Sequence, residues 1–106
     1  MSKYVAVVYF LAGAYYAIVP DIPEVHCSGE NIREALDNAS DELDGAIVMR
    51  RAFGEIPPEP SCFSAAMKLY RKMVGEHPSM AIKISPLSTL DHGNGYISQR
   101  DLSTAK

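Results

Sequence analysis

Two prolines three residues apart, Pro20 and Pro23, constrain the fold of this chain more than any other feature. Residues 14–19 before them are apolar and rich in aromatic and β-branched side chains, which is typical of a strand. Proline cannot donate a hydrogen bond to a sheet ladder, so this strand must stop and the backbone must bend at Pro20-Asp21-Ile22-Pro23. Residues 25–28 are then predicted to form a short strand of their own.

Two further strands are predicted near the ends of the chain. Residues 3–10 are dominated by valine, tyrosine and phenylalanine, and Gly13 marks the reversal into the strand at 14–19. Residues 80–85, Met-Ala-Ile-Lys-Ile-Ser, alternate in polarity and predict a fourth strand.

A long helix is predicted to follow the third strand. Gly29 ends that strand. Asn31 followed by Glu34 resembles a capping box at the start of a helix, with Asn in place of Ser or Thr. One apolar face recurs at helical spacing: Ile32, Leu36, Ala39, Leu43, Ala46 and Ile47.

A second helix is predicted after a proline-rich break. Pro57, Pro58 and Pro60 forbid continuation of the first helix, and Ser61 is placed to cap the next one. Its apolar positions are Ala65, Ala66, Leu69, Tyr70, Met73 and Val74, and Gly75 and Pro78 end it. The expected order is β-β-β-α-α-β, which is an α+β fold with a mainly antiparallel sheet packed on one long helix.

Two blocks of this sequence resemble the HicB family, the antitoxin half of bacterial HicA–HicB toxin–antitoxin pairs. The second block, residues 54–61, is close to the family's Gly-x-x-Ile/Leu-Pro-x-Pro-Ser and lies at the right distance. Two positions depart from the pattern, since Glu24 stands where the family usually has Gly and residues 11–14 replace a polar hairpin. The matching positions of the first block are Pro20, Asp21, Ile22, Pro23, Cys27, Gly29, Glu30, Asn31, Glu34, Ala35 and Asn38.

The resemblance implies a HicB-like domain over residues 1–85, with a partial ribonuclease H-like fold. The last strand then lies beside the first, and a crossover carrying both helices joins them. We expect the sheet order third, second, first, fourth. The two free edges favour a homo-oligomer, a dimer or a tetramer. Pro20, Asp21, Pro23, Gly29, Ala35, Pro57 and Pro60 are expected to be structural residues of the family motifs.

An acidic stripe is the second informative feature. At about 100° per residue, five acids fall opposite the apolar face of the first helix: Glu30, Glu34, Asp37, Asp41 and Asp44. Taken alone, such a stripe is explained by the solvated face that a surface helix needs. The family resemblance implies a basic, RNA-cleaving HicA-like toxin as partner, so these acids become candidate partner-binding residues that steer the toxin in.

Catalysis is disfavoured by what the strands carry. A ribonuclease H site holds metal ions on clustered carboxylates, whereas the strands at 4–9 and 14–19 contain no Asp or Glu. His26 and Cys27 are adjacent on a strand and therefore point to opposite faces. Cys27 and Cys62 lack zinc spacing and are expected to be reduced thiols in the core or half-buried. We expect no catalytic residues, no metal and no cofactor.

Composition limits where the chain works and what it binds. A length of 106 residues indicates one domain, and no long apolar run or basic leader suggests a membrane or export, so a cytoplasmic protein is expected. Residues 86–106 form a C-terminal tail too short for a complete DNA-binding module, although residues 96–100 could add a strand. With a net charge of −3, DNA binding through this chain alone is not expected.

The sequence thus favours a HicB-like antitoxin that inhibits a HicA-like mRNA-cleaving toxin by covering its RNA and active-site surface. Two alternatives stay open. One is an orphan scaffold or binding protein that keeps the fold without a toxin, and the other is a transcriptional regulator of its own operon.

Overall fold

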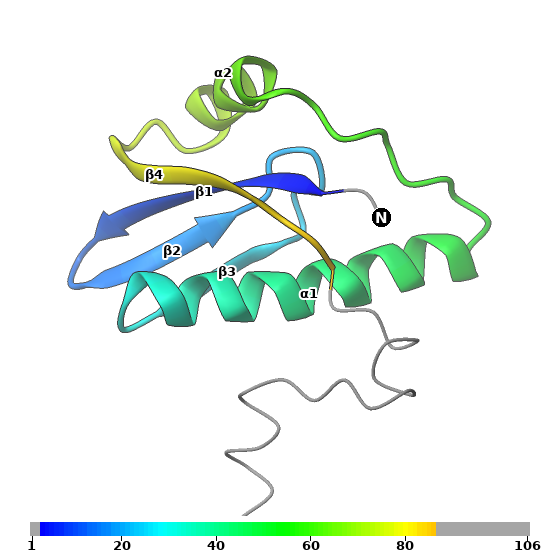
Figure 1. Ribbon diagram of the computed structural model, residues 1–106, viewed down its shortest axis with the longest axis horizontal. Coiled ribbons are helices and arrows are strands. Elements are labelled where there is room, and N and C mark those ends of the chain that lie inside the picture. Colours follow the sequence, from blue (N-terminus) through cyan, green and yellow to red (C-terminus); the bar gives the residue numbers. More distant parts are fainter. Residues whose placement is uncertain (1–2, 87–106) are drawn as a thin grey trace, which may run out of the picture.

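A computed structural model describes residues 3–86 of the chain. The elements follow in the order β1 (Tyr4–Leu11), β2 (Ala14–Ile18), β3 (His26–Gly29), α1 (Ile32–Ala52), α2 (Phe63–Met73) and β4 (Pro78–Ile84). Figure 1 shows the sheet between the two helices, with α1 along one face and α2 over the other. The α+β class and the order β-β-β-α-α-β are confirmed.

The sheet is antiparallel throughout and has the predicted order β3-β2-β1-β4. Val7 pairs with Ile18 of β2 and with Ala81 of β4, so β1 is central and the last strand lies beside the first. The hairpin between β1 and β2 turns at Ala12 and Gly13, which both have positive φ, 52° and 87°. Gly13 meets that requirement without strain because it has no Cβ.

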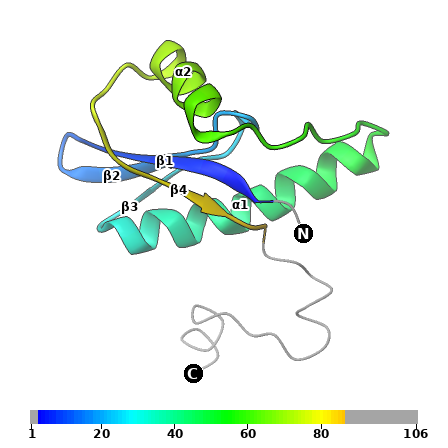
Figure 2. The same ribbon diagram turned by 45° about the horizontal axis from the view of Figure 1, so that its top comes forward.

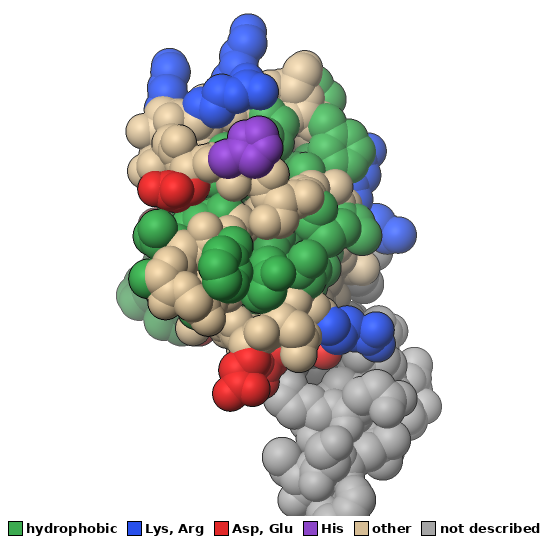
Figure 3. Space-filling view, turned by 90° about the vertical axis from the view of Figure 1, so that its left-hand side faces the viewer, with side chains coloured by type: hydrophobic (Ala, Val, Ile, Leu, Met, Phe, Trp, Pro, Cys, Tyr) green, Lys and Arg blue, Asp and Glu red, His purple; other side chains and the backbone are tan. Residues whose placement is uncertain are grey.

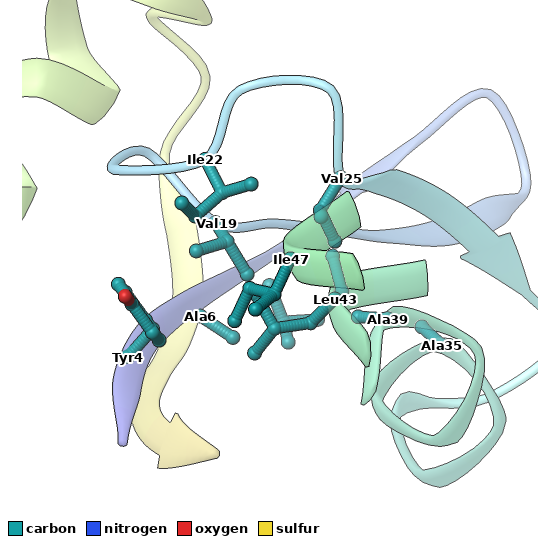
Figure 4. Packing of buried hydrophobic residues seen from close by; sticks show 11 residues of the cluster. Tyr4, Ala6, Val19, Ile22, Val25, Ala35, Ala39, Leu43 and Ile47 are labelled. Atoms are coloured by element: carbon teal, nitrogen blue, oxygen red, sulfur yellow. The ribbon is translucent and has the colours of Figure 1, made fainter. Parts of the chain in front are cut away.

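One face of the sheet packs on α1 (Figure 4). Tyr4, Ala6 and Val8 alternate toward this face along β1, as the pleat requires. The helix contributes four buried residues: Ala35, Ala39, Leu43 and Ile47. Val19, Ile22 and Val25 of the proline bend complete the cluster, so the bend is part of the core.

The opposite face packs on α2, which Figure 2 shows lying across the sheet on the side away from α1. Val5, Val7 and Tyr9 of β1 pack there with Ile18 and with two buried residues of the helix, Ala66 and Tyr70. The expectation of a sheet packed on one long helix is therefore incomplete. The second helix covers the second face through Ala66 and Tyr70, while its Leu69 and Met73 are exposed.

Ser61 does not cap the second helix, so that prediction is wrong. The N-cap is Cys62, which makes no side-chain capping hydrogen bond and is exposed, whereas the sequence predicted a core or half-buried thiol. The Ser61 hydroxyl instead donates to the carboxylate of Asp21 on the proline bend. The fourth strand also begins earlier than predicted, at Pro78. The expected tail strand at 96–100 lies outside the described residues.

Candidate protein-interaction surface

The acidic stripe rests on a well-capped helix. The Asn31 side-chain oxygen accepts a hydrogen bond from the Glu34 backbone N–H at 2.8 Å, as the sequence predicts. The Glu34 carboxylate accepts in turn from the Glu30 N–H at 2.6 Å. The first bond satisfies one of the free N–H groups of the first turn, and the second satisfies an N–H just before that turn. At the other end, Gly54 adopts φ +80° and its N–H donates to the Arg51 carbonyl. The helix is therefore fixed at both ends.

The structure places four of the five predicted acids on the outer side of α1 and the fifth just before it. Glu34 and Asp37 are exposed, while Asp41 and Asp44 are half-buried. Glu30 is exposed and precedes the cap. Arg33 lies 3.8 Å from Asp37, but both side chains are at least half exposed, so this pair contributes little. Asp37, Asp41 and Asp44 have other interactions within the chain. The Glu34 carboxylate is also engaged, because it accepts from the Glu30 N–H at the start of the helix.

An open depression of about 460 Å³ lies beside the second half of the stripe. Asp41 lines it together with Glu24 and Glu42, two carboxylates that the sequence did not single out. Gly45, Ala46 and Met49 supply its apolar part. Residues 41, 42, 45, 46 and 49 lie at helical spacing, and this pattern in the sequence indicates that they share one face of α1. Glu24 comes near them only through the bend after β2. The arrangement suits a long basic side chain, with a charged head and an apolar stem.

Glu24 is held there by Arg50 of α1. The Arg50 Nε lies 2.8 Å from Glu24 Oε2, and its Nη2 donates to Oε1 at 2.9 Å. This two-point hydrogen bond lowers the pKa of the Glu24 carboxyl below its ordinary value. Glu24 departs from the HicB pattern, and in this chain it ties the proline bend to the last turn of the helix.

A second depression, of about 370 Å³, lies at the start of the stripe. Glu30 and Glu34 line it with Asn38 and with Gly13 and Ala14 of the hairpin. The Asn38 amide donates to the Ser28 carbonyl at 2.9 Å and so fixes α1 to the edge strand β3. One depression therefore lies toward each end of the acidic stripe.

Residues of the two family motifs make hydrogen bonds that hold the fold together. The Asp21 carboxylate accepts from both the N–H and the hydroxyl of Ser61, each at 2.7 Å, which joins the first motif block to the second. The Tyr4 hydroxyl donates to the Pro58 carbonyl at 2.6 Å and anchors the same segment. Pro20 is buried, Pro57 and Pro60 are half-buried, and Pro23 is exposed.

Gly29 and Ala35 form the tightest approach between the sheet and α1. A Cβ on Gly29 would stand 2.5 Å from the Ala35 backbone nitrogen and 2.9 Å from the Glu34 carbonyl carbon. No side chain fits between the third strand and the first turn of the helix. These two motif positions are therefore fixed by packing.

The adjacent residues His26 and Cys27 point to opposite faces, as predicted. The His26 Nε2 lies 2.6 Å from the Tyr9 hydroxyl on the α2 side. Cys27 packs against the α1 cluster, and burial together with the nearby Glu42 carboxylate raises the pKa of its thiol to about 11. A thiol with so high a pKa is a poor nucleophile at neutral pH. Within residues 3–86, no group of three His, Cys, Asp or Glu side chains could hold a metal ion.

A basic surface on α2 was missed at the level of sequence. Lys68, Arg71 and Lys72 are exposed, and the helix Phe63–Met73 contains no acidic residue. The signal was visible as three basic residues at helical spacing, but it belongs to neither family motif. Figure 3 shows a group of Lys and Arg side chains at the α2 end of one face and hydrophobic side chains below it, while Asp or Glu side chains lie both near this group and at the α1 end, where a basic side chain accompanies them.

The strand order and the helix on each face define a small α+β domain built as helix, sheet and helix. None of the helices within residues 3–86 is both long and apolar enough to cross a membrane. A scan against protein-family models and a search of curated proteins both find no match.

Solved structures do match this domain. The N-terminal domain of the Burkholderia pseudomallei antitoxin HicB matches with a TM-score of 0.60 and 27% sequence identity, over 80% of this chain and 96% of that one. The antitoxin HicB of the same organism matches with a TM-score of 0.63 and 24% identity, over 99% of this chain and 79% of that one. The chain has the fold of the HicB N-terminal domain, which confirms the resemblance that the two proline-containing motifs predict.

Proposed function

We propose that this chain is a HicB-like antitoxin that binds a HicA-like, mRNA-cleaving toxin and inhibits it by covering its RNA and active-site surface. The match to the HicB N-terminal domain over 80% of the chain is the observation that supports the proposal most strongly. The chain then works by stoichiometric binding, without catalysis of its own. In this proposal, residues 1–85 form the binding domain.

The outer face of α1 is the surface we assign to the toxin. A protein that binds RNA presents Lys and Arg side chains to the negatively charged phosphates. The acidic side chains of α1 are also negatively charged, so they suit the same Lys and Arg side chains. Asp41 and Glu42 line the larger depression, where the Glu24 carboxylate is already paired with Arg50. Charges arranged in this way accelerate encounter and set partner choice more than final affinity.

Co-expression with the product of the adjacent gene tests the proposal. We expect a complex that survives purification and an RNA-cleavage rate that falls to background at equimolar antitoxin. If the chain binds no such protein and leaves cleavage unchanged, the antitoxin proposal is wrong, and an orphan scaffold or an operon regulator becomes the better account.

Charge reversal tests the surface. The double variant Asp37→Lys, Asp41→Lys should lower the association rate with the toxin by at least about tenfold at low salt, with a smaller effect at high salt. Stopped-flow or biolayer measurements of the on-rate against salt provide the readout. The matched control reverses two charges on the other side, Lys68→Glu and Lys72→Glu. An equal loss in the control would place the toxin elsewhere.

A further inference from the structure

Helices α1 and α2 lie on opposite sides of one sheet (Figure 1). The outer face of α1 carries Asp37, Asp41 and Asp44, and the outer face of α2 carries Lys68, Arg71 and Lys72. Each copy of the chain therefore presents a negative helix and a positive helix that face away from each other, so the two groups do not meet within one molecule.

Each helix also exposes large apolar side chains next to its charges. On α2, Leu69 is 38% exposed and Met73 is 41% exposed. On α1, Val48 is 51% exposed and Met49 is 55% exposed, one turn beyond the acids. On α2 these apolar side chains are bordered by charge of one sign, which is typical of a surface that binds a partner of the opposite sign, whereas on α1 the exposed Arg51 follows them.

The acidic group of α1 and the basic group of α2 have compatible lengths along their helices. Asp37 to Asp44 spans about 10 Å along α1, and Lys68 to Lys72 about 6 Å along α2, at about 1.5 Å per residue. The basic group is therefore short enough to lie over the acidic group. The neighbouring apolar side chains of the two helices can then meet at one end of the contact.

We propose that the outer face of α2 binds the outer face of α1 on a second copy of this chain. The contact is heterologous, because two different surfaces meet, and a pair of copies leaves one α1 face and one α2 face unoccupied. Further copies can add by the same contact. This arrangement differs from pairing at the free edges of β3 and β4, which joins like to like.

Self-association through α1 has a consequence for toxin binding, and this one step rests on the proposed function. If the α1 face is the toxin surface, self-association and toxin binding compete for it. The stored form of the inhibitor is then an assembly that the toxin takes apart. Failure of the two proposals is separable, because self-association is measured on the isolated chain.

Sedimentation velocity on the full chain at several concentrations and two salt concentrations tests the proposal. We expect concentration-dependent association at low salt that weakens with added salt. Two triple variants reverse one face each: Lys68→Glu, Arg71→Glu, Lys72→Glu in the first, and Asp37→Lys, Asp41→Lys, Asp44→Lys in the second. Each variant alone should associate more than about tenfold more weakly.

Mixing the two variants gives the decisive result. The acidic α2 of the first then meets the basic α1 of the second, so the mixture should regain association that neither variant has alone, which also shows that both are folded. A mixture that stays monomeric overturns the proposal. Association that is unaffected by either variant also overturns it and assigns assembly to the strand edges, while RNA binding lost only in the first variant, with association retained, assigns α2 to nucleic acid.

Discussion

At the scale of single residues, two glycines of the domain have opposite roles. A Cβ on Gly29 would meet the backbone of α1 at 2.5 Å, whereas a Cβ on Gly45, within α1, would have nothing within 4 Å of it. The first glycine is required for the strand and helix to approach. The second weakens its helix, because glycine is a poor helix former.

Substitution by alanine should therefore change stability in opposite directions. Gly29→Ala should lower the free energy of unfolding by about 2 kcal/mol or more, because helix backbone cannot move as a side chain can. Gly45→Ala should raise it by about 1 kcal/mol. Urea unfolding followed by circular dichroism measures both. Equal effects of the two substitutions would contradict the close approach at Gly29.

The ion pair between Glu24 and Arg50 predicts a pH dependence. Because the folded state lowers the Glu24 pKa from the ordinary 4.5, the stabilisation is fully present above that pH and is lost as pH falls through the lower folded value. Glu24 is 46% exposed, so the pair is worth less than about 1 kcal/mol. Thermal unfolding of Glu24→Gln should show a small loss at pH 7 and none at pH 2.

A second variant isolates this pair. In an Arg50→Gln background, Glu24→Gln should have no effect on stability at either pH, since the partner is gone. A loss at pH 7 that persists in that background would assign the effect to another contact of Glu24.

At the scale of elements, α1 carries two surfaces with different sensitivities. Leu43 is fully buried against the sheet, and Val48 on the outer side is half exposed. Leu43→Ala should cost about 2–5 kcal/mol through lost burial and a cavity. Val48→Ala should change stability by less than about 0.5 kcal/mol. Unfolding curves of the two variants, with toxin binding measured in parallel, separate the structural face from the binding face.

The hydrogen bonds of the segment between α1 and α2 explain why the two sequence motifs occur together. Asp21 of the first motif holds Ser61 of the second, and Tyr4 holds Pro58, which also belongs to the second motif. Because these hydrogen bonds hold the two motif blocks together, the motifs constrain the fold of the chain. Neither block identifies the surface that binds a partner.

At the scale of the whole molecule, the residue pattern was sufficient for the order of elements along the chain and for the main packing of α1, whereas the strand order followed from the resemblance to the HicB family. The prolines end elements, and the helical spacing of Ala39, Leu43 and Ile47 defines a buried face, because both signals are local. The position of α2 was not predictable in the same way. Its buried face is two residues, Ala66 and Tyr70, and the pairing of that face with the second side of the sheet depends on contacts far apart in sequence.

The candidate site was predicted only in part for the same reason. The acids of α1 follow from one helix and its period. Glu24 joins them through a bend that only the folded chain brings near, and Ser61 bonds across the molecule to Asp21 because a side chain with two possible partners takes the one that tertiary structure offers. Local patterns do not contain that choice.

The segment between the helices has a consequence for how long the protein lasts. Pro58 and Ser61 are tied down, but the residues just before them are open, with Phe53 74% exposed and Ile56 90% exposed. Exposed loops are the preferred sites of proteolytic nicking, and the prolines that follow are poor substrates. We expect turnover to begin there, with one cut separating α1 from α2 and β4. The half-life of the chain is then set by a few residues that contribute nothing to its core.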